Sequence, residues 1–338
     1  MTFGHGGTFA INGIAPQQRK VVTIDAMKQM IERVLGHHGD QELFVIFQFK
    51  TREAQPLIDK GQVVARQQFV LNPYQFPEIK AEEADVQKEE TESYVKLDAG
   101  GTSLTIGKRH GWIDYLDVDG EPMLLDRESI TPEFWRAPTD NDYGAGLQNR
   151  FAVWKNPQMR LKKLDVDDNE IEATYEMPDV KAELKMTYTL TKEGEVIVRE
   201  QLKADKEAKI ANMFRYGMQL QMPKAFNEVE YYGRGPVENY IDRNSSEFIG
   251  VYNNKVADEY YSYVRPQESG NHTDIRWFRV KNEAGKGLEF YSNAPMEACA
   301  LNFLMSDLDD GPRKEKSWGH HSGDLIERPL TQGHIQQR

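Results

Sequence analysis

The densest group of polar side chains in the sequence is the nonapeptide FWRAPTDND, from Phe134 to Asp142. Arg136 is a planar cation with several N–H donors, and Asp140, Asn141 and Asp142 carry oxygens that suit sugar hydroxyls or the arginine itself. Polar clusters of this kind are more often structural than catalytic. We therefore predict a buried turn in which Arg136 pairs with Asp140 or Asp142, and sugar binding is the alternative.

A second polar group surrounds the turn in YYGRGPVENYIDR, from Tyr231 to Arg243. Two glycines and a proline in the run GRGP require a sharp change of chain direction. No GxxxxGK[ST] frame is present, so this is not a phosphate-binding loop. We predict a structural motif, with a sugar-recognition loop as the alternative, built from Arg234, Glu238, Asn239, Asp242 and Arg243.

Three further groups are weaker candidates for chemistry. Asn282-Glu283 has the residue types of a glycosidase acid/base pair, but it joins IRWFRVK to GKGLEFYS, which predicts a hairpin turn with an exposed glutamate. His320 and His321 are adjacent, and neighbouring side chains point apart on regular structure, so they are poorly placed to share a metal. Cys299, the one cysteine, lies in an apolar run and predicts a buried core residue. We predict no metal site in this chain.

The elements that position these groups are expected to be strands. Apolar and polar residues alternate in runs bounded by Gly, Pro, Asn or Asp, which is typical of antiparallel sandwiches. Such runs cover residues 43–49, 63–71, 182–190, 195–202, 218–222, 275–280 and 288–292. One helix is expected over Ile24–Leu35, where a methionine-containing apolar stripe predicts core packing, Asp25 is a candidate cap and Gly36 is a candidate end.

A domain boundary is expected after residue 75. The prolines of NPYQFP interrupt strand structure, and the charged run EIKAEEADVQKEETE indicates a linker. We therefore predict a small β-rich domain at 1–75, a linker at 76–92 and one large all-β domain at 93–338.

Composition excludes several classes of function. The net charge of −12 over 338 residues argues against nucleic-acid binding, which needs a basic face. No apolar run is long enough to predict a membrane span. No signal peptide is visible at the start of the sequence, and both the cytoplasm and the periplasm remain open as locations.

The ordered motifs FWRAPTDND, YGRGPVENYIDR and YSYVRPQESGNHTDIRWFRV together resemble the large C-terminal domain, or small chain, of family 2 β-galactosidases. The resemblance extends from about Leu104 to the end of the chain. The first 72 residues resemble the fourth, immunoglobulin-like domain of the same family, with IAPQQRKVVTI as its first strands and AQPLIDKGQVVARQQFVL as its closing pair. The implied fold is all-β: an immunoglobulin-like sandwich, then a large supersandwich similar to galactose mutarotase.

The resemblance also implies an activity for the whole protein, which is hydrolysis of terminal β-D-galactosides with retention. Retaining enzymes use two carboxylates about 5–5.5 Å apart. In the family both belong to a TIM barrel that precedes these domains, so this chain is expected to be inactive alone and to have the enzyme's own N-terminal domains and the galactoside as partners. Any Mg and Na ions are implied near the barrel, with no cofactor in this chain. The whole enzyme is expected to be a homo-oligomer.

The site residues implied by the resemblance form a wall of the sugar pocket. They include Asp140, Asn141 and Asp142, followed by a mobile loop whose glycines supply hinge freedom. That loop comprises Gly144, Ala145, Gly146, Leu147, Gln148, Asn149 and Arg150. Gln332 occupies the position where the family places an aromatic platform. The family continues beyond Arg338, so the large domain is expected to be truncated at its C-terminus.

Two alternatives belong to other functional classes. A sugar epimerase of the mutarotase class would need a histidine acid and a glutamate base that face one pocket. A stand-alone carbohydrate-binding module would use exposed aromatic rings, for which Tyr231, Tyr232, Trp277 and Trp318 are candidates.

Overall fold

The computed structural model describes residues 6–11 and 13–309, and the backbone of residues 330–337. Residue contacts divide the chain into two compact units, Met1–Gln75 and Phe76–Arg338. None of the helices in the described part has both the length and the apolar character that a membrane span requires.

Unit 1 contains one helix and one hairpin. Helix α1 (Asp25–His38) confirms the predicted helix, but it continues through Gly36, and its N-cap residue Ile24 makes no side-chain capping bond. The methionine-containing stripe is only half-buried, and no residue of α1 is fully buried. The stripe therefore marks the inner face of the helix without reaching a closed core.

Strands β1 (Leu43–Lys50) and β2 (Val63–Asn72) form a two-stranded antiparallel sheet, close to the two predicted runs. In the described part of unit 1, the stretch IAPQQRKVVTI joins no ladder, so this unit shows a hairpin and a helix rather than two facing sheets. Apolar side chains on the hairpin are correspondingly exposed, for example Phe49 at 51% and Val70 at 57%.

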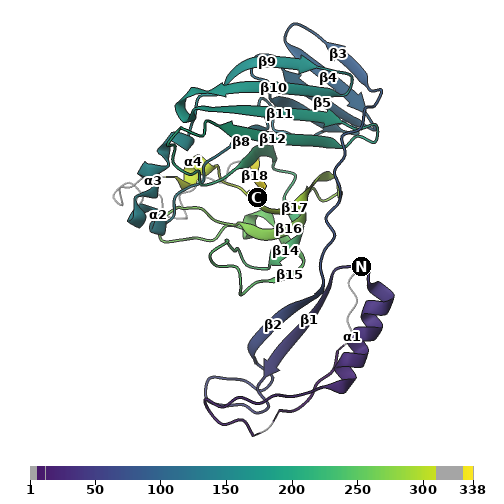
Figure 1. Ribbon diagram of the computed structural model, residues 1–338, viewed down its shortest axis with the longest axis vertical. Helices are drawn as coiled ribbons and strands as arrows, with labels where there is room; N and C mark the ends of the chain where they lie inside the picture. Colours follow the sequence, from purple (N-terminus) through teal and green to yellow (C-terminus); the bar gives the residue numbers. More distant parts are fainter. Residues whose placement is uncertain (1–5, 12, 310–329, 338) are drawn as a thin grey trace. The chain divides into compact units, whose positions relative to one another are not determined.

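Unit 2 is built from three antiparallel sheets and confirms the all-β class (Figure 1). The first sheet has the order β3-β4-β5-β6-β7 and the second the order β12-β11-β10-β9. Their strands are β3 (Gln87–Glu90), β4 (Tyr94–Ala99), β5 (Thr102–Gly107), β6 (Ile113–Val118), β7 (Glu121–Pro122), β9 (Arg160–Val166), β10 (Glu170–Met177), β11 (Ala182–Leu190) and β12 (Val196–Ala204).

The third sheet is the largest, with seven strands in the order β15-β14-β16-β17-β18-β13-β8. Its strands are β8 (Thr131–Glu133), β13 (Gly217–Pro223), β14 (Glu228–Gly235), β15 (Phe248–Lys255), β16 (His272–Lys281), β17 (Gly287–Leu301) and β18 (Leu330–Gln337). Short helices fill the connections: α2 (Asp140–Ala145), α3 (Leu147–Arg150), η1 (Ala152–Trp154), η2 (Pro178–Val180), η3 (Val256–Asp258) and α4 (Met305–Leu308).

One apolar core joins the three sheets. It contains Leu97 and Ile106 from the first sheet, Leu184 from the second, and Leu220 and Phe278 from the third. Burial alternates along the strands, as in β10, because successive side chains point to opposite faces. This alternation is the reason that the sequence pattern located β11, β12, β13, β16 and β17 to within a few residues, except that β17 continues to Leu301.

Candidate functional site: a polar framework beneath a helix pair

The segment FWRAPTDND leaves strand β8 and enters helix α2. Phe134 and Trp135 are buried in the core. The Arg136 guanidinium donates two hydrogen bonds to Asp142, with Nη1–Oδ2 at 2.6 Å and Nη2–Oδ1 at 3.2 Å, and it lies 4.5 Å from the centre of the Phe214 ring. The predicted pairing of Arg136 with Asp142 is therefore confirmed.

Asp142 also closes the N-terminus of α2. Its Oδ2 accepts hydrogen bonds from the Thr139 amide (2.8 Å) and hydroxyl (2.9 Å), while the Thr139 hydroxyl caps the Asp142 amide, which is a capping box. Burial opposes the charge on this carboxylate, but hydrogen bonds from Arg136 and Thr139 outweigh it and lower the Asp142 pKa below its ordinary 3.8. Asp142 is consequently an ionised structural acid with its oxygens occupied.

The residues expected to form a loop are helical in the structure. Helix α2 ends at Ala145, Gly146 follows with φ 68° in the left-handed region, and α3 begins at Leu147. Glycine is favoured at position 146 because other residues are strained at this φ. Gly144 lies inside α2 with open space around it, so nothing in its backbone requires glycine.

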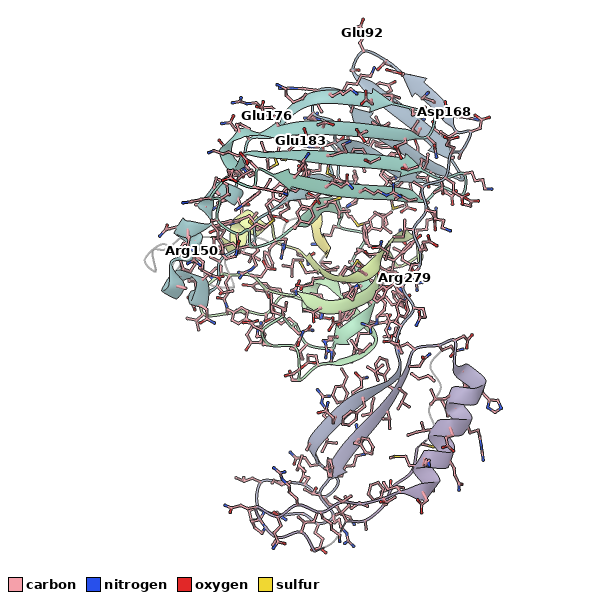
Figure 2. The ribbon with its side chains drawn as sticks, in the orientation of Figure 1. Glu92, Arg150, Asp168, Glu176, Glu183 and Arg279 are labelled. Atoms are coloured by element: carbon pink, nitrogen blue, oxygen red, sulfur yellow. The ribbon has the colours of Figure 1, made fainter. Side chains whose placement is uncertain are left out.

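Helices α2 and α3 form a pair, here called the helix pair, at the surface of unit 2 (Figure 1). Arg150 projects from its end (Figure 2). Leu147 and Gln148 are half-buried, whereas the side chains that face solvent are Asp140, Asn141, Ala145, Asn149 and Arg150. The helix pair thus presents carboxylate, amide and guanidinium groups, which can hydrogen-bond to hydroxyl-rich ligands.

The turn after β14 is organised by Glu238 and Asn239, both buried. Glu238 accepts hydrogen bonds from the Gly270 amide at 2.6 Å, from Arg243 at 2.6 Å and from the Tyr263 hydroxyl. The Asn239 side chain spans the turn by donating to the carbonyl of Arg234 and accepting from the Thr273 amide. These contacts agree with the structural interpretation of this motif.

The other two residues predicted for this motif differ in exposure. Arg234 is held by Asp274, with Nε–Oδ2 at 2.5 Å, and by the Glu247 carbonyl at 2.9 Å. Asp242 faces solvent, and within the described residues no hydrogen bond or ion pair holds it in the motif. It is the least constrained of the five.

The two motifs are linked by a third segment, Arg265–Thr273, in which all nine residues are buried. We call it the buried segment. Its Gln267 Oε1 accepts a hydrogen bond from the Asp140 amide at 3.0 Å, and its Arg265 lies 3.7 Å from the Asp140 carboxylate. At its other end, Asn271 exchanges hydrogen bonds with the backbone of Asn239. Motifs that are about 100 residues apart therefore share one polar framework.

A buried ion cluster supports the middle of this segment. Arg215 donates to Glu268 at 2.6 Å and lies 3.7 Å from Glu133. Burial disfavours the charge on Arg215, but the two carboxylates outweigh it and raise the pKa of the guanidinium. The sequence analysis missed this cluster, because three charged residues at positions 133, 215 and 268 carry no local pattern.

Several other polar or reactive side chains are held in turns or buried in the fold. Asn282 Oδ1 accepts from the amides of Ala284 and Lys286, which confirms the predicted hairpin turn. Cys299 is buried, as predicted. His272 and Glu259 form a buried pair at 2.6 Å. No group of three or more His, Cys, Asp or Glu side chains within the described part is arranged to hold a metal ion.

Gln332 lies in β18, where its backbone pairs with Gln221 of β13 and Leu301 of β17. Its side chain falls outside the described residues. The adjacent His320 and His321 and the aromatic Trp318 also lie outside them.

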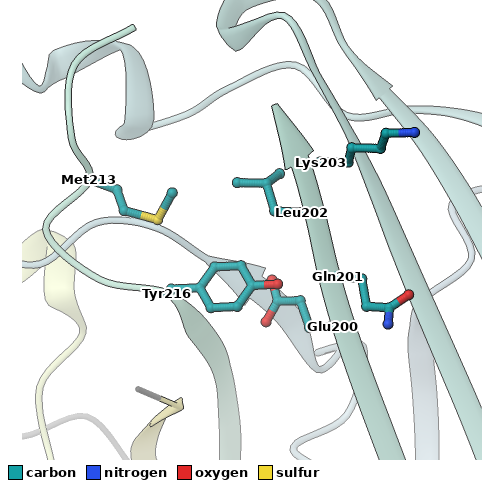
Figure 3. Close-up of a pocket in the computed structure, with 6 residues that line it drawn as sticks. All are labelled: Glu200, Gln201, Leu202, Lys203, Met213 and Tyr216. Atoms are coloured by element: carbon teal, nitrogen blue, oxygen red, sulfur yellow. The ribbon is translucent and has the colours of Figure 1, made fainter. Parts of the chain in front are cut away.

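A hollow in unit 2 lies beside strand β12 and measures about 600 Å³ (Figure 3). Glu200, Leu202, Met213 and Tyr216 are among its lining residues. One oxygen of Glu200 is buried without a hydrogen-bond partner, and burial raises the pKa of this carboxyl to about 8. None of the residues predicted as site residues lines this hollow.

Comparisons with known proteins agree with one another. Residues 98–337 match the family model for the β-galactosidase small chain, and residues 4–72 match that for β-galactosidase domain 4. A β-galactosidase from Priestia megaterium is 30% identical over 74% of this chain and 24% of its own length. One from Lactobacillus delbrueckii subsp. bulgaricus is 30% identical over 90% of this chain and 28% of its own length.

The chain thus spans about a quarter of the length of these curated relatives. Among solved structures, a galactose 1-epimerase from Lactobacillus acidophilus aligns over 74% of this chain and 97% of its own, with 11% identity and a TM-score of 0.25, which is too low to support an argument. The small-chain model, in contrast, covers well over half of the sequence. This chain therefore belongs to the β-galactosidase small chain family.

Proposed function

We propose that this chain is the non-catalytic C-terminal part of an enzyme that hydrolyses terminal β-D-galactosides with retention of configuration. In this proposal the chain supports a catalytic TIM barrel, and the helix pair forms one wall of the sugar pocket. The whole enzyme is a homo-oligomer whose partners are its own N-terminal domains and the galactoside.

The observation that carries the proposal is that the helix pair exposes polar side chains to solvent, while the residues that hold the pair in place are fixed by hydrogen bonds. The pair exposes Asn141, Asn149 and Arg150, while its base is fixed by the Arg136–Asp142 pair and by the buried segment. A rigid base with polar groups at its surface is what a recognition wall requires, because preorganised donors lose little entropy on binding.

Four buried acids of this framework already have hydrogen-bond or ion-pair partners, whereas Asp140 and Asp242 are exposed. Asp142 accepts from Arg136 and Thr139, Glu238 accepts from four donors, and Glu133 and Glu268 share Arg215. A retaining glycosidase needs one carboxylate free to attack and another free to transfer a proton. We assign that pair to the catalytic barrel.

We also assign any Mg²⁺ or Na⁺ of the whole enzyme to the barrel. Divalent cations prefer several converging oxygen ligands. The buried acids of the framework instead converge on guanidinium and amide donors, which gives a poor fit to a cation.

The epimerase alternative is less well supported. It would use a histidine and a glutamate that face a pocket. The buried His272 and Glu259 contact each other at 2.6 Å, and they do not line the hollow beside β12. The binding-module alternative relies on exposed rings. Tyr231 is fully buried, and a guanidinium lies over each of Tyr232 and Trp277.

The purified chain and the full-length protein should be compared with nitrophenyl β-galactoside as substrate. We expect turnover by the full-length protein and none above the blank by this chain, because a wall supplies neither nucleophile nor acid. Turnover that co-purifies with this chain would overturn the proposal. In the full-length protein, replacing Asn149 and Arg150 by alanine should raise KM, with the double replacement of Glu183 and Arg279, elsewhere on unit 2, as the matched control (Figure 2).

A further inference from the structure

The buried segment Arg265–Thr273 has an unusual character for a connection. Connections normally run over the surface, because buried backbone must find hydrogen-bond partners within the protein. Here Glu238 binds the Gly270 amide, the Asn239 amide donates to the Asn271 carbonyl at 2.7 Å, and Arg215 binds Glu268. The segment is therefore fixed from several sides along most of its length.

The start of the buried segment reaches the helix pair. The guanidinium of Arg265 lies 3.8 Å from the centre of the Tyr143 ring, and its Nη1 is 3.7 Å from Asp140 Oδ1. Arg265 is 7% exposed, whereas the Asp140 side chain is 67% exposed. An ion pair with an exposed partner contributes little, but stacking of a desolvated guanidinium on a ring is stronger. Of these two contacts of Arg265, the one with Tyr143 is thus the stronger.

The position of Tyr143 in α2 determines which part of the helix pair the Arg265–Tyr143 contact restrains. The Arg136–Asp142 pair and the Gln267–Asp140 bond both hold the first turn of α2. Tyr143 directly follows Asp142 and precedes Gly144 and the left-handed Gly146 at which the chain turns into α3. A contact at Tyr143 therefore restrains α2 one residue nearer to the turn into α3 than the Arg136–Asp142 pair does.

We propose that Arg265 is the positioning residue of the helix pair: its guanidinium, fixed in the buried segment, sets the position of α2 and α3 by stacking on Tyr143. Arg265 acts through Tyr143 and touches no substrate. The consequence for catalysis rests on the proposed function of the pair as a pocket wall, whereas the positioning itself does not.

The test measures amide hydrogen exchange in this chain, in peptides that cover residues 139–150. Arg265→Met keeps the length of the side chain and removes its charge, and Tyr143→Leu removes the ring from the other partner. Tyr143→Phe keeps the ring and is the conservative variant. Arg279→Met is the control, because Arg279 stacks on Trp277 at 4.3 Å on strand β16.

We expect Arg265→Met and Tyr143→Leu each to speed exchange in residues 139–150 about tenfold, with β10 and β11 unchanged. Tyr143→Phe and Arg279→Met should match the wild type. If Arg265→Met also exposes β10 and β11, its fold is lost and Tyr143→Leu alone decides. Wild-type exchange in Tyr143→Leu overturns the proposal.

Kinetics of full-length Tyr143→Leu separate the two proposals. We expect kcat and KM for nitrophenyl β-galactoside to change together at an unchanged melting temperature. Faster exchange with wild-type kinetics would uphold the positioning role and refute the wall function. Wild-type exchange with altered kinetics would refute the positioning role alone.

Discussion

Replacing Glu200 by glutamine should remove most of the alkaline loss of stability of unit 2. Glu200 lies on β12, an edge strand of the four-stranded sheet, and its carboxyl points toward the Tyr216 ring in the hollow of Figure 3. One carboxyl oxygen is buried without a partner, and within the described residues no cation forms an ion pair with it. Burial therefore raises its pKa from 4.5 to about 8.

The sign follows from proton binding. Between pH 4.5 and about 8 the folded chain holds a proton on Glu200 that the unfolded chain has released. Stability contributed by this group is then complete below pH 4.5 and is lost as pH rises to about 8. A tenfold change in proton affinity is worth about 1.4 kcal/mol, so the loss has an upper limit of about 5 kcal/mol. Glu200 is partly exposed, and water reaching it reduces the expected loss to about 2–3 kcal/mol.

The assay is urea denaturation of wild type and Glu200→Gln at pH 5, 7 and 9. We expect nearly equal unfolding free energies at pH 5 and a glutamine variant that is about 2–3 kcal/mol more stable at pH 9. Glu183→Gln, on the exposed face of β11, is the control and should leave the pH dependence unchanged (Figure 2). A difference between wild type and Glu200→Gln that stays constant from pH 5 to pH 9 would refute the reasoning.

Two further predictions concern the base of the helix pair. Arg136→Ala should lower the free energy of unfolding by about 2–4 kcal/mol, because it leaves the buried Asp142 carboxylate without its partner, and an unchanged melting curve would contradict this. Gly146→Ala should cost about 1–2 kcal/mol because its φ is 68°, whereas Gly144→Ala in the helix should gain up to about 1 kcal/mol. Urea midpoints that shift in the same direction for both glycines would show that the two positions do not differ.

The sequence by itself determined where strands form and which kind of hydrogen-bond partner a single side chain requires. Strands such as β11 and β13 were predictable because burial on one face imposes a period of two on the side chains. The pairing of Arg136 with Asp142 was predictable because a guanidinium that leaves solvent requires an acceptor, and Asp142 was near in the chain. The family resemblance was carried by the same local motifs.

Only the tertiary structure decided which segments meet. Asp140 binds Gln267, and Arg215 binds Glu268, across sequence separations that no local pattern encodes. Antiparallel strands can pair in many orders and registers, and the choice depends on packing of the whole core. The sequence also does not distinguish the two glycines. Only the structure shows that the left-handed turn favours glycine at position 146, whereas the backbone at Gly144 is one that other residues can adopt. Glu200 could be recognised as an interior acid only once β12 was placed against Tyr216, because its neighbours in sequence are ordinary strand residues.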